Sequence, residues 1–264
     1  MKKYLTVINV YWQRALTYRS TVFAYRVGEM AEVLILILMW SSIYDKQDVI
    51  KGFTLPEMIT YVLIGNLFNA ITRNFLTHIV ASDIKEGRLS TFLLQPISYF
   101  NFILSRELGR LSVAFLMSIS SQVIVILFFL SKFILNSDII YLSVILLMII
   151  LAFVSELLIS YLIGLIAFWA DEVDGIFTTV DRLRKFFSGG YFPLNFLPPI
   201  FVTASFSLPF AYSFFVPAQL YLKKIDISAG IRGIFIQLIW IALLYGIIRL
   251  LWRRGLKKYE GVGI

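Results

Sequence analysis

The chain reads YLSVILLMIILAFVSELLISYLIGLIAFWA over residues 141–170, and Glu156 is the only charged residue in this run. A helix needs roughly 20 mainly apolar residues to cross the hydrocarbon core of a bilayer. The run exceeds that length, so it predicts a membrane-spanning helix over residues 139–169 and makes lipid the main solvent of the fold.

The composition of the whole chain agrees with a membrane protein. Of its 264 residues, 59% are hydrophobic, whereas soluble domains are about 45–50% apolar. Further apolar runs predict spans at 22–44, 55–79, 99–130, 175–217 and 229–252, which makes six transmembrane helices in all. These spans leave no room for a separate soluble domain of ~100 residues. We therefore expect an all-α integral membrane protein with a single transmembrane domain over residues 1–264.

Missing residue types and motifs exclude several chemistries. The chain has no cysteine, which excludes disulfides and thiolate metal sites, and its single histidine, His78, cannot form a histidine cluster. It has no Gly-x-x-x-x-Gly-Lys-Ser/Thr loop, no HExxH and no GxSxG motif. We therefore expect no enzymatic activity, no ATP hydrolysis by a phosphate-binding loop, and no metal or cofactor bound by this chain. The amino-terminal residues do not predict a cleaved signal peptide.

Lysine and arginine residues predict the orientation. Eighteen of the 24 lie in the amino-terminal region, the second and fourth loop regions and the carboxy-terminal tail, which the six spans place on one side. Positively charged loops stay in the cytoplasm. We therefore expect cytoplasmic termini and a multi-pass protein of the cell membrane, the inner membrane in a bacterium. The net charge of +8 then faces anionic lipid head groups rather than nucleic acid.

The first 21 residues predict a helix that lies in the head-group plane. On a helical wheel, Leu5, Ile8, Trp12 and Leu16 fall on one face, and polar residues concentrate on the other. Tyrosine and tryptophan rings suit that depth. We interpret this helix either as a simple anchor or as a lever that transmits motion to the first span.

Residues 83–98 read DIKEGRLSTFLLQPIS and separate two long apolar runs. Each charge here would cost about 2.5–3.5 kcal/mol at the centre of a bilayer, so residues 80–98 are expected in the cytoplasm. Gly87 can end a helical turn, and Pro96 redirects the chain. Five apolar residues are expected to form a ridge that docks in a protein groove: Ile84, Leu89, Phe92, Leu93 and Leu94. The alternative is an ordinary solvated loop.

The fifth apolar run cannot be one regular helix. Residues 189–217 contain Gly189, Gly190, Pro193, Pro198, Pro199 and two further prolines. Lipid offers no partner for backbone groups that proline leaves free, so we expect broken re-entrant helices on the outer side, before the last span. The five named residues are candidates for an outer gate, and the alternative is a static packed cap. The charges at 181–185 conflict with a span that starts at 175, unless that span starts later or those side chains face protein or water.

Three acidic residues fall well inside predicted spans: Glu29, Glu32 and Glu156. A charged group at that depth must face protein or water. Glu156 is expected either to contact a substrate or to make a structural contact, with Arg73 or Arg26 as partner. Glu29 lies one turn after Arg26, so an ion pair within that helix is expected.

These features together resemble the membrane subunits of ABC type-2 exporters, in particular small bacterial permeases that work with a separate ATPase. Tyr18-Arg19, the loop GFTLPEMITY at residues 52–61, residues 83–98 and the proline-rich region carry the resemblance. It implies that residues 80–98, named the coupling segment below, contact the ATPase. The coupling residues would be Asp83, Ile84, Lys85, Glu86, Gly87, Arg88 and Leu89. It also implies two permeases, alike or different, and two nucleotide-binding subunits that carry ATP and magnesium.

The predicted function is ATP-driven export from the cytoplasm. Phenylalanine, tyrosine and tryptophan make up 16% of the chain, which fits a hydrophobic or amphipathic substrate but is equally explained by lipid-facing and packing roles. Two other classes stay open. A secondary transporter would use Glu156 as its intramembrane acid, and an assembly protein of the membrane would not transport at all.

Overall fold

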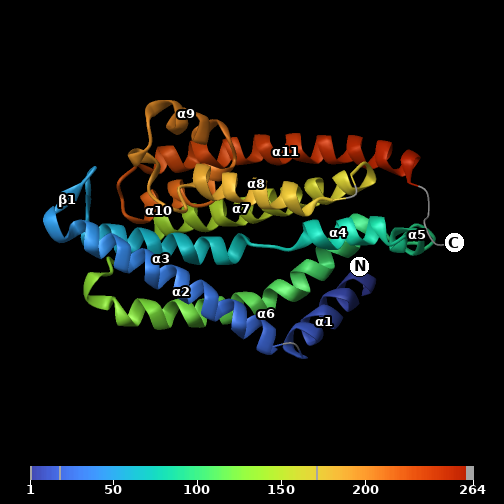
Figure 1. Cartoon of the computed structure of the whole chain (residues 1–264), viewed down its shortest axis with the longest axis horizontal. Helices are drawn as coiled ribbons and strands as arrows, with labels where there is room; N and C mark the ends of the chain where they lie inside the picture. The colour runs from blue at the N-terminus through green and yellow to red at the C-terminus, as the bar shows by residue number, and fades with distance from the viewer. Residues whose placement is uncertain (1, 18, 171, 260–264) are drawn as a thin grey trace.

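The computed structural model describes residues 2–17, 19–170 and 172–259. Tyr18, part of the resemblance above, lies outside the described residues, and so does the side chain of Arg19. The long helices run along the long axis of the molecule (Figure 1). The α-helices are α1 Lys2–Thr17, α2 Arg19–Ile43, α3 Leu55–Thr72, α4 Leu76–Lys85, α5 Arg88–Leu93, α6 Tyr99–Phe128, α7 Ile139–Leu165, α8 Asp174–Ser188, α9 Pro199–Ser207, α10 Phe215–Tyr221 and α11 Ile227–Lys258.

The β structure among the described residues is one small hairpin. Strands β1 (Val49–Ile50) and β2 (Phe53–Thr54) pair antiparallel. Between them Lys51 and Gly52 both have positive φ, 50° and 82°, which is the backbone of a tight primed turn. The hairpin leads into α3, where a capping box at Thr54 and Glu57 starts the helix. The all-α class is therefore confirmed, with this one local exception.

Four described helices are long and apolar enough to cross a membrane. They cover Arg26–Lys46, Tyr99–Phe128, Ile139–Phe168 and Ile227–Lys258. A fifth candidate is α9 taken together with residues 210–221, two pieces that meet at an angle of 80°. The structure therefore shows a multi-pass membrane protein, whereas the count of six spans stays a prediction.

The predicted span at 55–79 is wrong as a continuous helix. Helix α3 ends at Thr72 and α4 begins at Leu76, with an extended connection between them (Figure 1). Arg73 is extended, and its backbone N–H donates to the carbonyl of Asn69 at 2.9 Å. The side chain of Asn74 accepts from the N–H of Leu76 at 3.2 Å. These bonds give partners to two backbone N–H groups that the helix break would otherwise leave free.

The predicted span at 175–217 is also interrupted. Helix α8 ends at Gly189, whose φ of 82° favours glycine, and short helices follow. Pro198 caps α9 and Pro199 is its first residue, while Pro209 precedes the turn at Phe210–Tyr212. The helix breaks therefore occur at proline or glycine residues. Their re-entrant placement in a membrane stays a prediction.

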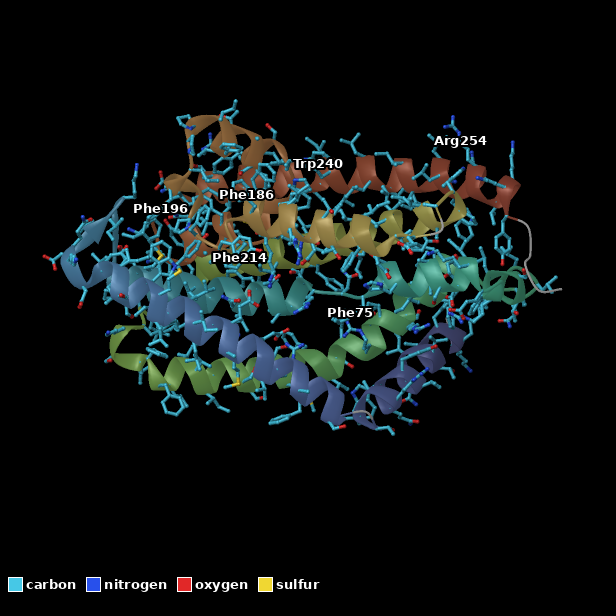
Figure 2. The ribbon with its side chains drawn as sticks, in the orientation of Figure 1. Phe75, Phe186, Phe196, Phe214, Trp240 and Arg254 are labelled. Atoms are coloured by element: carbon cyan, nitrogen blue, oxygen red, sulfur yellow. The ribbon has the colours of Figure 1, made fainter. Side chains whose placement is uncertain are left out.

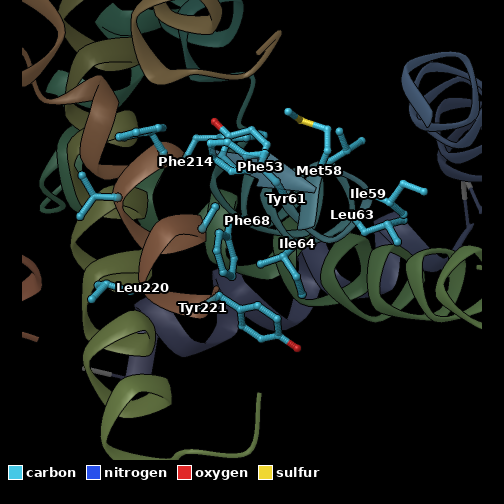
Figure 3. Close-up of a cluster of buried hydrophobic side chains, with 14 of the residues drawn as sticks. Phe53, Met58, Ile59, Tyr61, Leu63, Ile64, Phe68, Phe214, Leu220 and Tyr221 are labelled. Carbon is cyan, nitrogen blue, oxygen red and sulfur yellow. The ribbon is translucent and has the colours of Figure 1, made fainter. Parts of the chain in front are cut away.

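The larger core cluster lies at the end of the bundle that carries the hairpin. Figure 3 shows Phe53, Tyr61 and Phe214 packed with aliphatic side chains of α3. The ring of Tyr61 meets those of Phe53 and Phe214 edge to face, with centroids 6.0 and 5.5 Å apart. Such pairs favour one fixed arrangement. The prolyl region after α8 is thereby packed onto α3.

Helix α1 packs along α6. Gly109 on α6 permits the approach, because a Cβ there would lie 2.4 Å from the carbonyl oxygen of Ile8. The ring of Tyr11 contacts Phe102 edge to face. Leu5 and Trp12 remain exposed. One face of α1 is therefore exposed, while another is committed to α6. The placement of the exposed face in the lipid head-group region stays a prediction.

Candidate functional site

The coupling segment folds as an elbow between α4 and α5. Gly87 stands at the corner with a φ of 75°, a left-handed conformation that costs other residues roughly 1–2 kcal/mol. Helix α4 ends at Lys85 and α5 starts at Arg88, so two short helices change direction around one glycine. Sequence reasoning identified this glycine for that reason.

Arg88 ties the elbow together. Its Nε donates to Oδ1 of Asp83 at 2.8 Å, a second nitrogen donates to the hydroxyl of Ser82 at 2.6 Å, and it also pairs with Glu86. The hydrogen bond that Arg88 donates to Asp83 raises the pKa of the Arg88 guanidinium above its usual value. Asp83 is buried, and its other oxygen accepts from the hydroxyl of Tyr99 at 2.9 Å. One buried carboxylate therefore joins the ends of α4, α5 and α6.

The predicted apolar ridge is wrong for two of its members. Ile84 and Leu89 are buried in the core, at 5% and 0% exposure. Phe92 packs against the rings of Tyr99 and Phe102. Leu93 and Leu94 remain exposed, and so do three charged residues: Lys85, Glu86 and Arg88. The surface that a partner can reach is therefore charged, with a leucine pair beside it, and Ile84 and Leu89 hold it in place.

Both ends of the chain contact the coupling segment. Lys3 donates to the carbonyl of Pro96 at 2.5 Å, and the hydroxyl of Tyr4 accepts from the N–H of Ser98 at 3.2 Å. The hydroxyl of Tyr259 lies 3.1 Å from that of Ser90. Sequence reasoning missed these contacts, because nothing in a local pattern shows which loop a terminus will reach. The described start of α1 and the end of α11 lie toward the same end of the molecule as α5 (Figure 1).

Charged side chains gather around the α3–α4 break. Glu29 pairs with Arg26 at 2.5 Å and with Arg73 at 3.2 Å, which confirms the expected pair within α2. Arg26 also bonds the hydroxyl of Ser118 on α6. Arg73 lies 5.7 Å from the ring centroid of Phe75, in the connection labelled in Figure 2. The break is therefore linked by charge to α2 and α6.

Glu156 pairs with Arg184 on α8, at 3.4 Å, and both side chains are nearly inaccessible. The expected partners, Arg73 and Arg26, are wrong, since both pair with Glu29. Arg184 also binds Asp181 at 2.8 Å. Of the charges at 181–185 that conflicted with a span, Asp181 and Arg184 thus face protein, whereas Arg182 is exposed. A cavity of about 70 Å³ lies against this pair and is lined also by residues of the α3–α4 break.

Glu32 and Lys185 form a further link, at 3.2 Å, between α2 and α8. A second small polar cavity, of about 20 Å³, is lined by these two residues and by Arg184. Arg184 therefore borders both cavities. The three predicted acids, Glu29, Glu32 and Glu156, thus each bond a base on another segment of the bundle.

Glu107 was missed by sequence reasoning. Its side chain is fully buried in α6 and pairs with Arg110 one turn later. The guanidinium of Arg110 lies 5.1 Å from the ring centroid of Phe75. The sequence could have revealed it, because Glu107 is an acidic residue inside the predicted span at 99–130. Among the described residues no group of acids and histidine has the arrangement of a metal site.

The candidate gate residues lie at helix ends. Gly189 is buried, and its carbonyl accepts from the hydroxyl of Tyr61 at 2.7 Å. Gly190 is half-buried and Pro193 is buried. Pro198 and Pro199 are exposed at the start of α9. Their role in a gate stays a prediction.

The fold and the charged, discontinuous helices define an all-α multi-pass membrane protein. Residues 30–263 match the family described as ABC-2 family transporter protein. The chain therefore belongs to that family. It is a permease, the membrane component of a transporter and not itself the ATPase. Permeases of this family normally pair with an ATPase subunit. A comparison with curated protein sequences gave no match.

Proposed function

We propose that this permease is half of an ATP-driven exporter, and that the coupling segment receives the ATPase stroke. The observation that carries the proposal is the elbow at Gly87, closed by Arg88 and Asp83. A rigid corner with exposed charges at its tip can transmit a push, whereas a solvated loop would absorb it. Lys85 and Glu86 are the charged residues placed to meet a partner.

The proposed assembly contains two nucleotide-binding subunits, which carry ATP and magnesium, and a second permease, alike or different. The basic ends of α1 and α11 lie beside the coupling segment. Positively charged segments stay in the cytoplasm. This arrangement supports cytoplasmic termini in the cell membrane, with the ATPase docked on the same side.

Helix α8 supports a pathway between two permeases. Thr178, Thr179 and Arg182 form part of an exposed polar face on this helix. The two threonine hydroxyls bond carbonyls of their own helix, but the charge of Arg182 is costly in lipid, so this face requires water or a second permease. The aromatic content of the chain fits a hydrophobic or amphipathic substrate.

The mechanism follows from these contacts. ATP binding closes the partner subunits, which push on residues 83–88. The buried Asp83 passes the displacement to Tyr99 at the start of α6. Displacement of α4 bends the connection at residues 73–75, and the ion pairs around it carry the motion to α2 and α8. The gate residues after α8 would then open toward the outside.

The test is purification from the native host in mild detergent, followed by mass spectrometry and ATPase assay of the complex in vesicles. We expect a near-stoichiometric ATPase subunit, and loss of transport-coupled ATPase activity in Gly87→Trp and Arg88→Glu. Gly28→Trp and Arg232→Glu are matched controls, because a Cβ on Gly28 meets open space and Arg232 lies exposed at the far end of α11. Unchanged coupled activity in Gly87→Trp and Arg88→Glu would contradict the role of the segment.

A secondary carrier is the rival, and the setting of Glu156 disfavours it. A proton or sodium relay needs an acid that can be released near the midplane. Glu156 is bound to Arg184, which also holds Asp181, so its carboxylate is already paired within the protein. Transport that persists after ATP depletion would favour the carrier.

A further inference from the structure

A groove of about 460 Å³ lies between the coupling segment, the start of α6 and the end of α11. Its volume falls in the range of about 300–1,000 Å³ that small-molecule sites occupy. Aromatic rings form much of its wall, and the rings of Tyr99 and Trp252 stack in parallel with centroids 5.6 Å apart.

Arg249 supplies one charge at the groove, and no acidic residue lines it. The side chain is exposed and makes no ion pair with any acid in the described part of the chain. Its guanidinium lies 5.8 Å from the ring centroid of Tyr245. Ser98 and Asn101 add polar groups on the α6 side, and both are exposed. A ligand with an anionic head and polar hydroxyls matches this arrangement.

The surroundings of the groove select a membrane lipid. Tyr245, Ile247 and Leu250 are exposed on α11, one of the spanning candidates, so lipid tails reach that face of the helix. The last turns of α11 add Arg253, Arg254, Lys257 and Lys258. Clusters of basic residues at the end of a membrane helix attract anionic lipids.

We propose that this groove binds an anionic glycerophospholipid, with its phosphate on Arg249 and an acyl chain along Tyr161, Tyr99 and Trp252. The bound lipid would bridge the coupling segment and α11. The proposal concerns lipid binding alone and holds whether or not the chain transports.

The first experiment is native mass spectrometry of the full chain, titrated in detergent with phosphatidylglycerol and separately with phosphatidylcholine. We expect retention of one phosphatidylglycerol, and about tenfold weaker retention in Arg249→Gln, the effect of one lost charge-assisted hydrogen bond. Arg232→Gln is the matched control, because Arg232 is exposed near the opposite end of α11, outside the groove lining and outside the basic cluster. Arg249→Lys should restore most of the preference. Equal retention of the two lipids, or equal loss in Arg249→Gln and Arg232→Gln, would overturn the proposal.

A second experiment locates the lipid in the unmodified chain and does not depend on the folding of a variant. Photoactivatable phosphatidylglycerol is cross-linked in vesicles, and the modified peptides are identified. Adducts within residues 92–101 and 245–252 support the proposal. Adducts confined to other segments contradict it, and so does protection of these peptides by a second copy of the chain or by the ATPase.

Discussion

The hydroxyl of Tyr99, at the start of α6, donates to the buried carboxylate of Asp83, near the end of α4, at 2.9 Å. Sixteen positions separate the two residues in sequence, and the whole exposed tip of the coupling segment lies between them. The bond therefore closes the base of the segment. It adds a direct side-chain link to the backbone connection between the tip and α6.

Tyr99→Phe tests this closure. The substitution removes one hydrogen bond and leaves one oxygen of Asp83 without that partner, so we expect a loss of about 1–3 kcal/mol in unfolding free energy. Hydrogen exchange should rise in residues 83–93. Tyr191→Phe is the control, since Tyr191 is exposed and bonded to no described side chain through its hydroxyl. Equal exchange in Tyr99→Phe and the unmodified chain would refute the closure.

The Glu156–Arg184 pair predicts an asymmetric effect. Arg184→Gln leaves Glu156 buried without its cation, and breaking such a pair costs about 3–5 kcal/mol. Glu156→Gln should lower the unfolding free energy by less, because Arg184 retains its ion pair with Asp181 at 2.8 Å. Denaturant unfolding in detergent measures both. Arg182→Gln is the control, because Arg182 is exposed and lies two positions before Arg184, and it should leave the unfolding free energy nearly unchanged. Equal losses for Glu156→Gln and Arg184→Gln would show that Asp181 does not compensate.

The contact of α1 with α6 predicts an unusual glycine effect. Alanine favours a helix over glycine by up to about 1 kcal/mol, so Gly246→Ala, in open space on α11, should be neutral or stabilising. Gly109→Ala should lower the melting temperature, because its Cβ would stand 2.4 Å from the carbonyl oxygen of Ile8. Scanning fluorimetry compares the two variants. The same change in melting temperature for both variants would argue that α1 does not pack closely against Gly109.

An ion pair at the start of α7, outside the spans, predicts that the stability of the fold depends on pH. Lys223 donates to Asp138 at 2.9 Å, and this bond lowers the pKa of Asp138 below its usual value. Since the folded pKa is depressed, the stabilisation is present above the unfolded pKa of about 3.9 and is lost as the pH falls through the lower folded value.

Asp138→Asn checks this effect. The amide oxygen can still accept from the N–H of Ile140 and so cap α7, but it cannot titrate. We expect the melting temperature of the unmodified chain to fall more steeply below about pH 4 than that of the variant. Parallel pH profiles would rule out a contribution from the pair.

Local patterns determined much of this protein. Apolar runs such as residues 141–170 specify membrane helices because the bilayer sets their length. Gly87, and prolines such as Pro198 and Pro199, mark turns and breaks because their backbones allow or forbid particular dihedral angles. These properties belong to single residues or to one helix, so they can be read along the chain.

Only the tertiary structure decided the partners. Glu156 met Arg184 rather than Arg73, Ile84 and Leu89 turned inward, and Tyr259 reached Ser90 from the other end of the chain. The break at residues 73–75 also escaped the sequence, because apolar residues continue on both sides of it. Such outcomes depend on which helices pack together and at what depth. A buried charge takes the base that packing brings within reach, and distance along the chain does not specify which one that is.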